Sequence, residues 1–206
     1  MKIGIIGSGR IGGTLGLHLA EAGHEVTFSS RHPENLTDLV TSGGSRASAD
    51  TPQEAAARAD LLVFSPPWRT REEAAAAIER HVANKIVIDT TNPYGENGQI
   101  VDLEPSTSSE EVAKLLPGAR VVKAFNTIYF EHLRARSRPG ADGPLTIFVA
   151  GDDPEAKEVV GDLIKEISLA PVDTGSLSEG GRKQQPGSWI YNKPMAPGEA
   201  EAALDN

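Results

Sequence analysis

Three glycines near the N-terminus have a spacing that suits the binding of a pyrophosphate. The segment Gly7-Ser8-Gly9-Arg10-Ile11-Gly12 directly follows an apolar run, Lys2 to Ile6, and opens a helical pattern. In such a G-x-G-x-x-G segment the first glycine permits a tight turn, the second lets backbone approach the pyrophosphate, and the third lets the helix pack close to the strand. The helix N-terminus adds free N–H groups and the positive end of its dipole. We therefore predict dinucleotide binding here. The alternative is a glycine-rich turn without a ligand, and Arg10 either adds a cation near the adenosine phosphate or points to solvent.

The residues after the second predicted strand, Glu25 to Phe28, indicate which dinucleotide the site prefers. A site selective for NAD carries Asp or Glu at this position, where the carboxylate accepts hydrogen bonds from the ribose 2′-OH. Here the chain reads Ser29-Ser30-Arg31-His32, and the first carboxylate is that of Glu34. Hydroxyl, guanidinium and imidazole groups suit a 2′-phosphate, and the guanidinium matches phosphate geometry. The segment favours NADP over NAD, unless Arg31 and His32 are solvated turn residues.

Three further predicted strands end in residues that can surround a nicotinamide, because ligands of open α/β sheets lie beyond the carboxyl ends of the strands. These strand ends read Ser65-Pro66-Pro67-Trp68, Asp89-Thr90-Thr91-Asn92-Pro93-Tyr94 and Lys123-Ala124-Phe125-Asn126-Thr127-Ile128. Trp68 offers an aromatic wall to a planar substrate, with a position in the core as the alternative. Asn92 and Asn126 carry amides that can bind a carboxamide or hold a loop.

Other chemistries find little support in the residue types. The chain has no cysteine, which excludes disulfides, thiolate metal sites and a cysteine nucleophile. The five histidines are dispersed without the spacing of zinc ligands, so no metal site is predicted. Neither a G-x-S-x-G elbow nor a Walker motif occurs. No acid–base pair stands out, so no catalytic residue is assigned with certainty. A hydride transfer between stacked cofactors needs none, because the cofactors carry the chemistry.

The composition argues against several kinds of partner. Lys and Arg number 20 against 29 Asp and Glu, which gives the 206 residues a net charge of -9. Such an acidic chain repels phosphate backbones, so neither nucleic acid nor an anionic membrane is an expected partner. No secretory signal or membrane-spanning run is visible, and we expect a cytoplasmic protein.

Alternating strands and helices must position these residues. Short apolar runs alternate with helical patterns, which is typical of βαβ units and of a parallel sheet covered on both faces. The predicted strands are 2–6, 25–28, 46–48, 61–64, 85–89, 120–124, 145–150 and 171–173. The predicted helices are 11–22, 33–40, one from 52, 72–81, 108–116 with Ser108 or Ser109 as its cap, 154–167 and 197–204. We predict an α/β fold with a doubly wound, mainly parallel Rossmann sheet in a single domain, residues 1–174. A C-terminal arm, residues 175–206, packs on the site or on a partner subunit, and residues 174–194 form an ordered loop.

The order of these motifs resembles one known family. It reads Ile5-Ile6-Gly7-Ser8-Gly9-Arg10-Ile11-Gly12, then Ser29-Ser30-Arg31, then Asp89-Thr90-Thr91-Asn92-Pro93, then Val122-Lys123-Ala124-Phe125-Asn126-Thr127. In these segments the chain resembles the deazaflavin (coenzyme F-420)-dependent NADP oxidoreductases. The resemblance implies NADP bound by residues 7–12 and 29–31, a nicotinamide near residues 65–67 and 124–128, and a deazaflavin or another acceptor stacked over it. Residues 177–187 depart from this pattern and look like a subgroup with a poorly defined substrate.

Together these observations predict an enzyme that transfers a hydride between NADP(H) and a deazaflavin or flavin-like acceptor. The predicted cofactor-binding residues are Gly7, Ser8, Gly9, Arg10, Ile11, Gly12, Ser29, Ser30, Arg31, His32, Ser65, Pro66, Pro67, Asn92, Ala124 and Asn126. The predicted wall of the hydride-transfer pocket is formed by Trp68, Asn126 and Ile128. Trp189 and Tyr191 of the arm either close this pocket or contact a second subunit in a homodimer.

Two alternatives stay open. The first is an NADPH-dependent reductase of a small carbonyl, imine or metal chelate, which needs a proton donor; Tyr129, Tyr94 and His132 are the candidates. The second is a non-catalytic sensor of the NADP(H) redox ratio, with the same phosphate site and no turnover.

Overall fold

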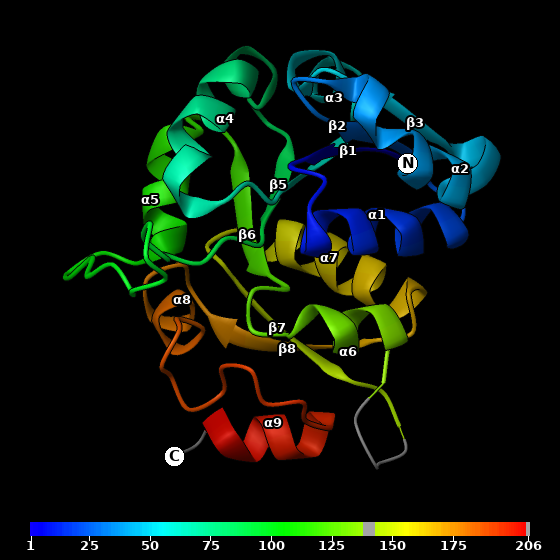
Figure 1. Cartoon of the computed structure of the whole chain (residues 1–206). Helices are drawn as coiled ribbons and strands as arrows, with labels where there is room; N and C mark the ends of the chain where they lie inside the picture. Colours follow the sequence, from blue (N-terminus) through cyan, green and yellow to red (C-terminus); the bar gives the residue numbers. More distant parts are fainter. Residues whose placement is uncertain (138–142, 205–206) are drawn as a thin grey trace.

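A computed structural model describes residues 1–137 and 143–204, and the strands in these ranges form one sheet (Figure 1). The strands are β1 (Lys2–Ile6), β2 (Glu25–Ser29), β3 (Ala47–Asp50), β4 (Leu61–Phe64), β5 (Ile86–Asp89), β6 (Arg120–Ala124), β7 (Thr146–Gly151) and β8 (Ala170–Gly175). Their order in the sheet is β3-β2-β1-β4-β5-β6-β7-β8, and every neighbouring pair is parallel except β6 and β7. The predicted doubly wound, mainly parallel sheet is thereby confirmed.

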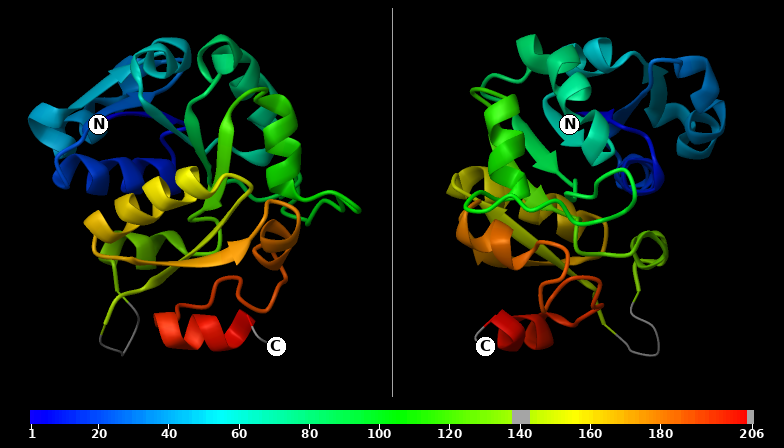
Figure 2. Two further views of the ribbon diagram at one scale, coloured as in Figure 1. Left: turned by 180° about the vertical axis from the view of Figure 1, so that it is seen from behind. Right: turned by 60° about the vertical axis from the view of Figure 1, so that its left-hand side comes forward.

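Helices cover both faces of this sheet (Figure 2). The α-helices are α1 (Arg10–Glu21), α2 (Thr37–Gly43), α3 (Pro52–Arg58), α4 (Arg71–Ile78), α5 (Ser108–Leu115), α6 (Phe130–Ala135), α7 (Pro154–Glu166), α8 (Glu179–Lys183) and α9 (Pro197–Leu204). Short 3-10 turns precede or follow several of them, namely η1 (Pro33–Leu36), η2 (Gly44–Arg46), η3 (Trp68–Thr70) and η4 (Glu79–His81).

Side chains that alternate along the strands build two large cores, one on each face of the sheet. In β1, Ile5 belongs to a core shared with α1, α6 and α7, whereas Ile6 belongs to a core shared with α3, α4 and α5. Neighbouring strands keep this alternation, because Ile5 lies level with Phe28 on one side and with Val63 on the other. The central strands β1 and β4 are apolar on both faces, which explains their continuous hydrophobic runs.

The structure corrects three details of the predicted elements. The N-cap of α5 is Thr107, whose hydroxyl accepts from the backbone of Glu110 while the Glu110 carboxylate accepts from the backbone of Thr107. Helix α6 and the turns η2 and η3 were not predicted, and all three are too short to show a periodic pattern. The arm, predicted as a loop over residues 174–194, contains helix α8.

The arm lies against the far edge of the sheet. Helix α9 covers β7 and β8 through a small core of Phe148, Val172, Ile190 and Ala200. Residues 205–206 of the predicted arm lie outside the described residues. A boundary between 174 and 175 stays a prediction, and it falls just before the last residue of β8.

Candidate functional site

The three glycines of the loop after β1 each occupy the kind of position that the motif requires. Gly7 has a φ of +99°, and a Cβ there would lie 2.6 Å from the carbonyl oxygen of Ser65. A Cβ on Gly12 would lie 2.2 Å from the carbonyl oxygen of Gly7, so α1 can approach β1 only with glycine at this position. A Cβ on Gly9 would meet no heavy atom within 4 Å. The backbone of Gly9 therefore faces open space at the N-terminus of α1.

Two serines connect the glycine loop to the end of β2. The Ser8 hydroxyl donates to the carbonyl oxygen of Ser29 at 3.1 Å and accepts from the Ser29 amide at 3.0 Å. The Ser29 hydroxyl donates to the carbonyl oxygen of Ile5 at 2.7 Å and is buried. These bonds hold the loop and the strand end in one arrangement, while Ser30 and Arg31 continue toward solvent.

A cavity of about 760 Å³ opens at the ends of β1, β2, β4 and β5. This volume lies within the roughly 300–1,000 Å³ of ligand pockets. Twelve of the predicted cofactor-binding residues line it: Gly7, Ser8, Gly9, Arg10, Ile11, Ser29, Ser30, Arg31, Ser65, Pro66, Pro67 and Asn92. Residues that carry no motif complete the lining and were not predicted, namely Pro52 at the start of α3 and Arg69, Thr70, Glu73, Ala74 and Ala77 in η3 and α4.

Trp68 combines the two roles that its sequence position suggested. It lines the cavity, yet only 6% of its surface is exposed and it packs in the core beneath α3 and α4. The guanidinium of Arg71 lies 4.1 Å from the centroid of its ring, which fixes the indole from one side.

The two asparagines at the ends of β5 and β6 hold each other. Asn92 donates through Nδ2 to the carbonyl oxygen of Asn126 at 2.8 Å, and Asn126 donates through Nδ2 to Oδ1 of Asn92 at 3.1 Å. A positive φ of +64° at Phe125 turns the chain sharply just before Asn126. Asn126 also donates to the carbonyl oxygen of Gln184 at 2.7 Å, so this pair joins the strand ends to the arm.

The arm reaches the edge of the cavity through one tyrosine. The Tyr191 hydroxyl accepts from Asn92 Nδ2 at 3.2 Å and from the Tyr94 hydroxyl at 3.1 Å. Burial, together with the bond from Tyr94, raises the pKa of Tyr191 well above its ordinary value, so this phenol stays protonated at neutral pH. Trp189 lies away from the cavity, is 67% exposed and has the ammonium of Lys193 3.4 Å from its ring centroid.

A buried ion pair supports the floor beside Asn92. Lys123 and Asp89 are both 0% exposed, and Lys123 Nζ lies 2.9 Å from Asp89 Oδ2. Lys123 also donates to the carbonyl oxygen of Thr91 and to the Ser108 hydroxyl at 3.1 Å. Burial lowers the pKa of Lys123, and the Asp89 carboxylate opposes this shift. The ammonium therefore anchors the backbone of the segment that enters the cavity.

Several predicted site residues do not line this cavity. Gly12 acts through packing, and the His32 ring pairs with Glu34 in solvent, where Nδ1 lies 3.1 Å from Oε1. Ala124, Asn126 and Ile128 are buried behind the lining. Asn126 does not reach the cavity but is hydrogen-bonded to Asn92, which lines it. Ile128 packs in the core beside α6.

The arrangement fits a nucleoside phosphate better than other ligand classes. The N-terminus of α1 has no acidic residue in its first turn and no side-chain cap, so its N–H groups are available to an anion.

Within residues 1–137 and 143–204, no group of three or more acidic or histidine side chains could hold a metal ion. In the same ranges, no helix combines the length and the apolar character needed to cross a membrane.

Comparison with known proteins agrees with this geometry. Residues 2–93 match the family model described as NADP oxidoreductase, coenzyme F420-dependent. The F420-dependent NADP reductase of Methanothermobacter thermautotrophicus is 32% identical over 193 residues, which cover 86% of this chain and 82% of that protein. The crystal structure of a hypothetical protein from Sinorhizobium meliloti superposes with a TM-score of 0.85 at 29% identity and covers 95% of both chains.

A longer relative shares only this part of its chain. Metalloreductase STEAP3 of Rattus norvegicus is 31% identical over 177 residues, which cover 86% of this chain. The matching region spans about a third, 34%, of the length of that metalloreductase.

Proposed function

Because the chain belongs to the family of coenzyme F420-dependent NADP oxidoreductases, we propose that it transfers a hydride between NADP(H) and a deazaflavin or flavin-like acceptor. The observation that carries the proposal is the cavity beyond β1, β2, β4 and β5, with the free N-terminus of α1 and the guanidinium of Arg31 on its lining. A pyrophosphate and a 2′-phosphate are the two anions of one such cofactor, and the cavity has a cationic or N–H-rich surface for each.

The residues of the chain bind and orient the cofactor. Backbone N–H groups at Gly9 and Arg10 receive the pyrophosphate, and Ser30 and Arg31 receive the 2′-phosphate. When bound, NADPH supplies the hydride from its nicotinamide ring. Pro66, Trp68 and Asn92 lie at the other end of the lining, where they form a rigid wall that orients the nicotinamide and excludes water.

The proposal also covers the location of the protein, its assembly and the role of its arm. We infer a cytoplasmic location from the acidic, cysteine-free composition, and a homodimer in which the exposed Trp189 of the arm contacts the second copy. Tyr191 closes the edge of its own cavity through Asn92 and Tyr94.

The test has two stages. Purified protein is titrated in parallel with NADPH and NADH by nicotinamide fluorescence, and a clear preference for NADPH is expected. NADPH deuterated at nicotinamide C4 is then mixed with coenzyme F420, and transfer of deuterium to the ring carbon of the deazaflavin is followed by mass spectrometry. With FMN or FAD, whose reduced ring nitrogen exchanges its hydrogen with water, the oxidation of NADPH is followed by its absorbance instead. Binding without transfer to any acceptor would favour the redox sensor instead, and binding of neither dinucleotide would refute the proposal.

One relative supports a second candidate acceptor. Because a metalloreductase matches most of this chain, a metal chelate such as ferric citrate belongs in the same acceptor panel. Reduction of the chelate by NADPH without any added flavin or deazaflavin would favour this candidate over the first.

A further inference from the structure

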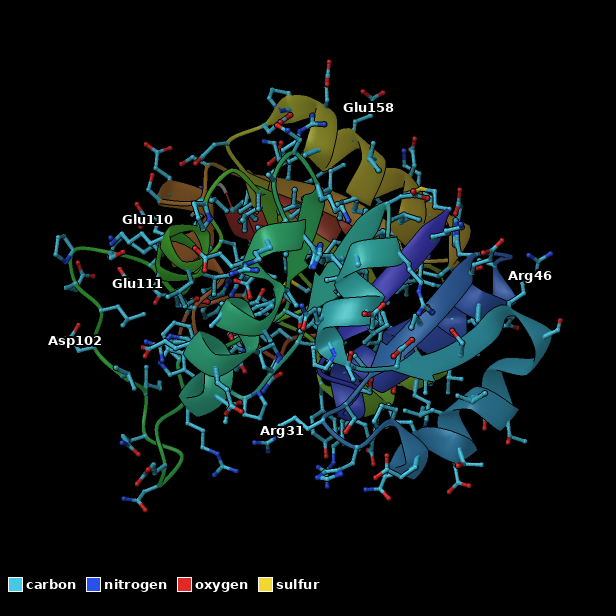
Figure 3. The ribbon with its side chains drawn as sticks, turned by 90° about the horizontal axis from the view of Figure 1, so that it is seen from above. Arg31, Arg46, Asp102, Glu110, Glu111 and Glu158 are labelled. Atoms are coloured by element: carbon cyan, nitrogen blue, oxygen red, sulfur yellow. The ribbon has the colours of Figure 1, made fainter. Side chains whose placement is uncertain are left out.

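An ion pair joins the two sides of the cavity at its mouth. Arg31 NH1, from the segment after β2, lies 3.1 Å from Glu73 Oε1 on α4, and both residues line the cavity. The two side chains are 76% and 62% exposed. In Figure 3, Arg31 lies between the N-terminal strands and helices in blue and the green helices that include α4.

The carboxylate of Glu73 binds the guanidinium of Arg31, where a 2′-phosphate would bind in its place. A guanidinium binds carboxylates and phosphates through the same planar donors, so the two anions compete for Arg31. An exposed pair of this kind is weak, so a phosphate with two negative charges can displace the Glu73 carboxylate from Arg31. Displacement does not remove the carboxylate, which stays on α4 within a few ångströms of the phosphate and repels it. For NADH the situation differs, because its ribose 2′-OH can donate to a carboxylate.

From these contacts we propose that Glu73 is a specificity-determining residue that weakens the binding of NADP(H) and reduces its preference over NAD(H). The inference rests on the proposed function, since it requires NADP(H) in this cavity. Glu73 supplies from α4 the carboxylate that the end of β2 lacks. Its effect is to keep a doubly charged phosphate exchangeable, so that product leaves the site readily.

The other charges near the mouth do not provide the same competition. Glu34 pairs with His32, and Glu72 pairs with Arg71 at 3.0 Å on the side of α4 that does not line the cavity. Glu72 therefore offers a matched control, because the same charge is lost from the same helix without a contact to Arg31.

The test compares the full-length wild type with Glu73→Gln and Glu72→Gln by isothermal titration with NADPH and with NADH. Glu73→Gln should bind NADPH about two- to fivefold more tightly, the range of one exposed ion pair, with NADH unchanged or weaker. Glu72→Gln should leave the ratio of the two dissociation constants as in the wild type. In an Arg31→Ala background, the effect of Glu73→Gln should shrink, because the competition for Arg31 is lost and only the repulsion between the Glu73 carboxylate and the phosphate remains.

The outcomes distinguish a failure of the inference from a failure of the proposed function. The preference for NADPH is expressed as the dissociation constant of NADH divided by that of NADPH. If the wild type prefers NADPH and Glu73→Gln leaves this ratio unchanged or lowers it, Glu73 does not compete for Arg31. The inference is then overturned while the proposed function stands. A lowered ratio would mean that Glu73 orients Arg31 for the phosphate. If both variants shift the ratio equally, the effect is one of net charge and the inference also fails. If the wild type binds neither dinucleotide, the proposed function fails and this inference with it.

Discussion

The replacement Arg31→Ala is the most direct test of the cofactor site. A charge-assisted hydrogen bond contributes roughly 1.5–3 kcal/mol, and Arg31 gives up its pair with Glu73, worth about 0–1 kcal/mol, to form it. The difference leaves about 0.5–3 kcal/mol for the 2′-phosphate, which corresponds to a roughly 2- to 150-fold weaker affinity for NADPH. Affinity for NADH should change little, because NADH lacks the 2′-phosphate that Arg31 is proposed to bind.

The assay is a pair of fluorescence titrations at low and high ionic strength. Since Arg31 is exposed, the loss should shrink as salt is raised from about 0.05 M toward 1 M. Arg46→Ala is the matched control, because Arg46 is also exposed, donates to the carbonyl oxygen of Gly23, and lies on another side of the molecule in Figure 3. Equal losses for NADPH and NADH in Arg31→Ala, or an equal loss of NADPH affinity in Arg46→Ala, would refute the assignment of Arg31 to the 2′-phosphate.

Two further predictions concern the glycine loop and a surface ion pair. Gly12→Ala should lower the free energy of unfolding by about 1–3 kcal/mol, because its Cβ would collide with the Gly7 carbonyl oxygen. Both variants are measured by denaturant titration. Gly9→Ala should have the free energy of unfolding of the wild type and should bind NADPH more weakly. Equal losses of stability in Gly12→Ala and Gly9→Ala would contradict the packing argument. The hydrogen bonds from Arg120 hold the pKa of Asp153 at about 2, below its ordinary 3.8, so the native state is stabilised above pH ~4 and loses this stabilisation as the pH falls through about 2. In Asp153→Asn the asparagine can still cap α7. The melting temperature of this variant should therefore lie below that of the wild type at pH 6 and approach it toward pH 2. A difference in melting temperature that stays constant with pH would contradict the Arg120–Asp153 pair as its cause.

Local patterns in the sequence were sufficient for most of the elements. The apolar runs of β1, β4 and β5 and the turn at Gly23, with a φ of +105°, depend on residues within a few positions of each other. Short elements carry too weak a pattern to be predicted, because α6 has six residues and its Phe130 and Leu133 do not repeat often enough to show a period. The cap of α5 is Thr107, one or two residues before the predicted Ser108 or Ser109, because all three carry a hydroxyl and only the backbone geometry selects among them.

The sequence alone determined the glycine loop and the polar end of β2, since a motif of six residues and a strand end of four residues are local features with a direct physical meaning. The tertiary structure decided which distant residues face them. It placed Glu73 of α4 against Arg31 and Tyr191 of the arm against Asn92, pairs that are 42 and 99 positions apart. Such contacts depend on the twist of the sheet and the packing of each helix on it, which no local pattern encodes. The proposed pyrophosphate site can therefore be predicted from the sequence, whereas Glu73, which we propose as a specificity-determining residue, can be identified only in the fold.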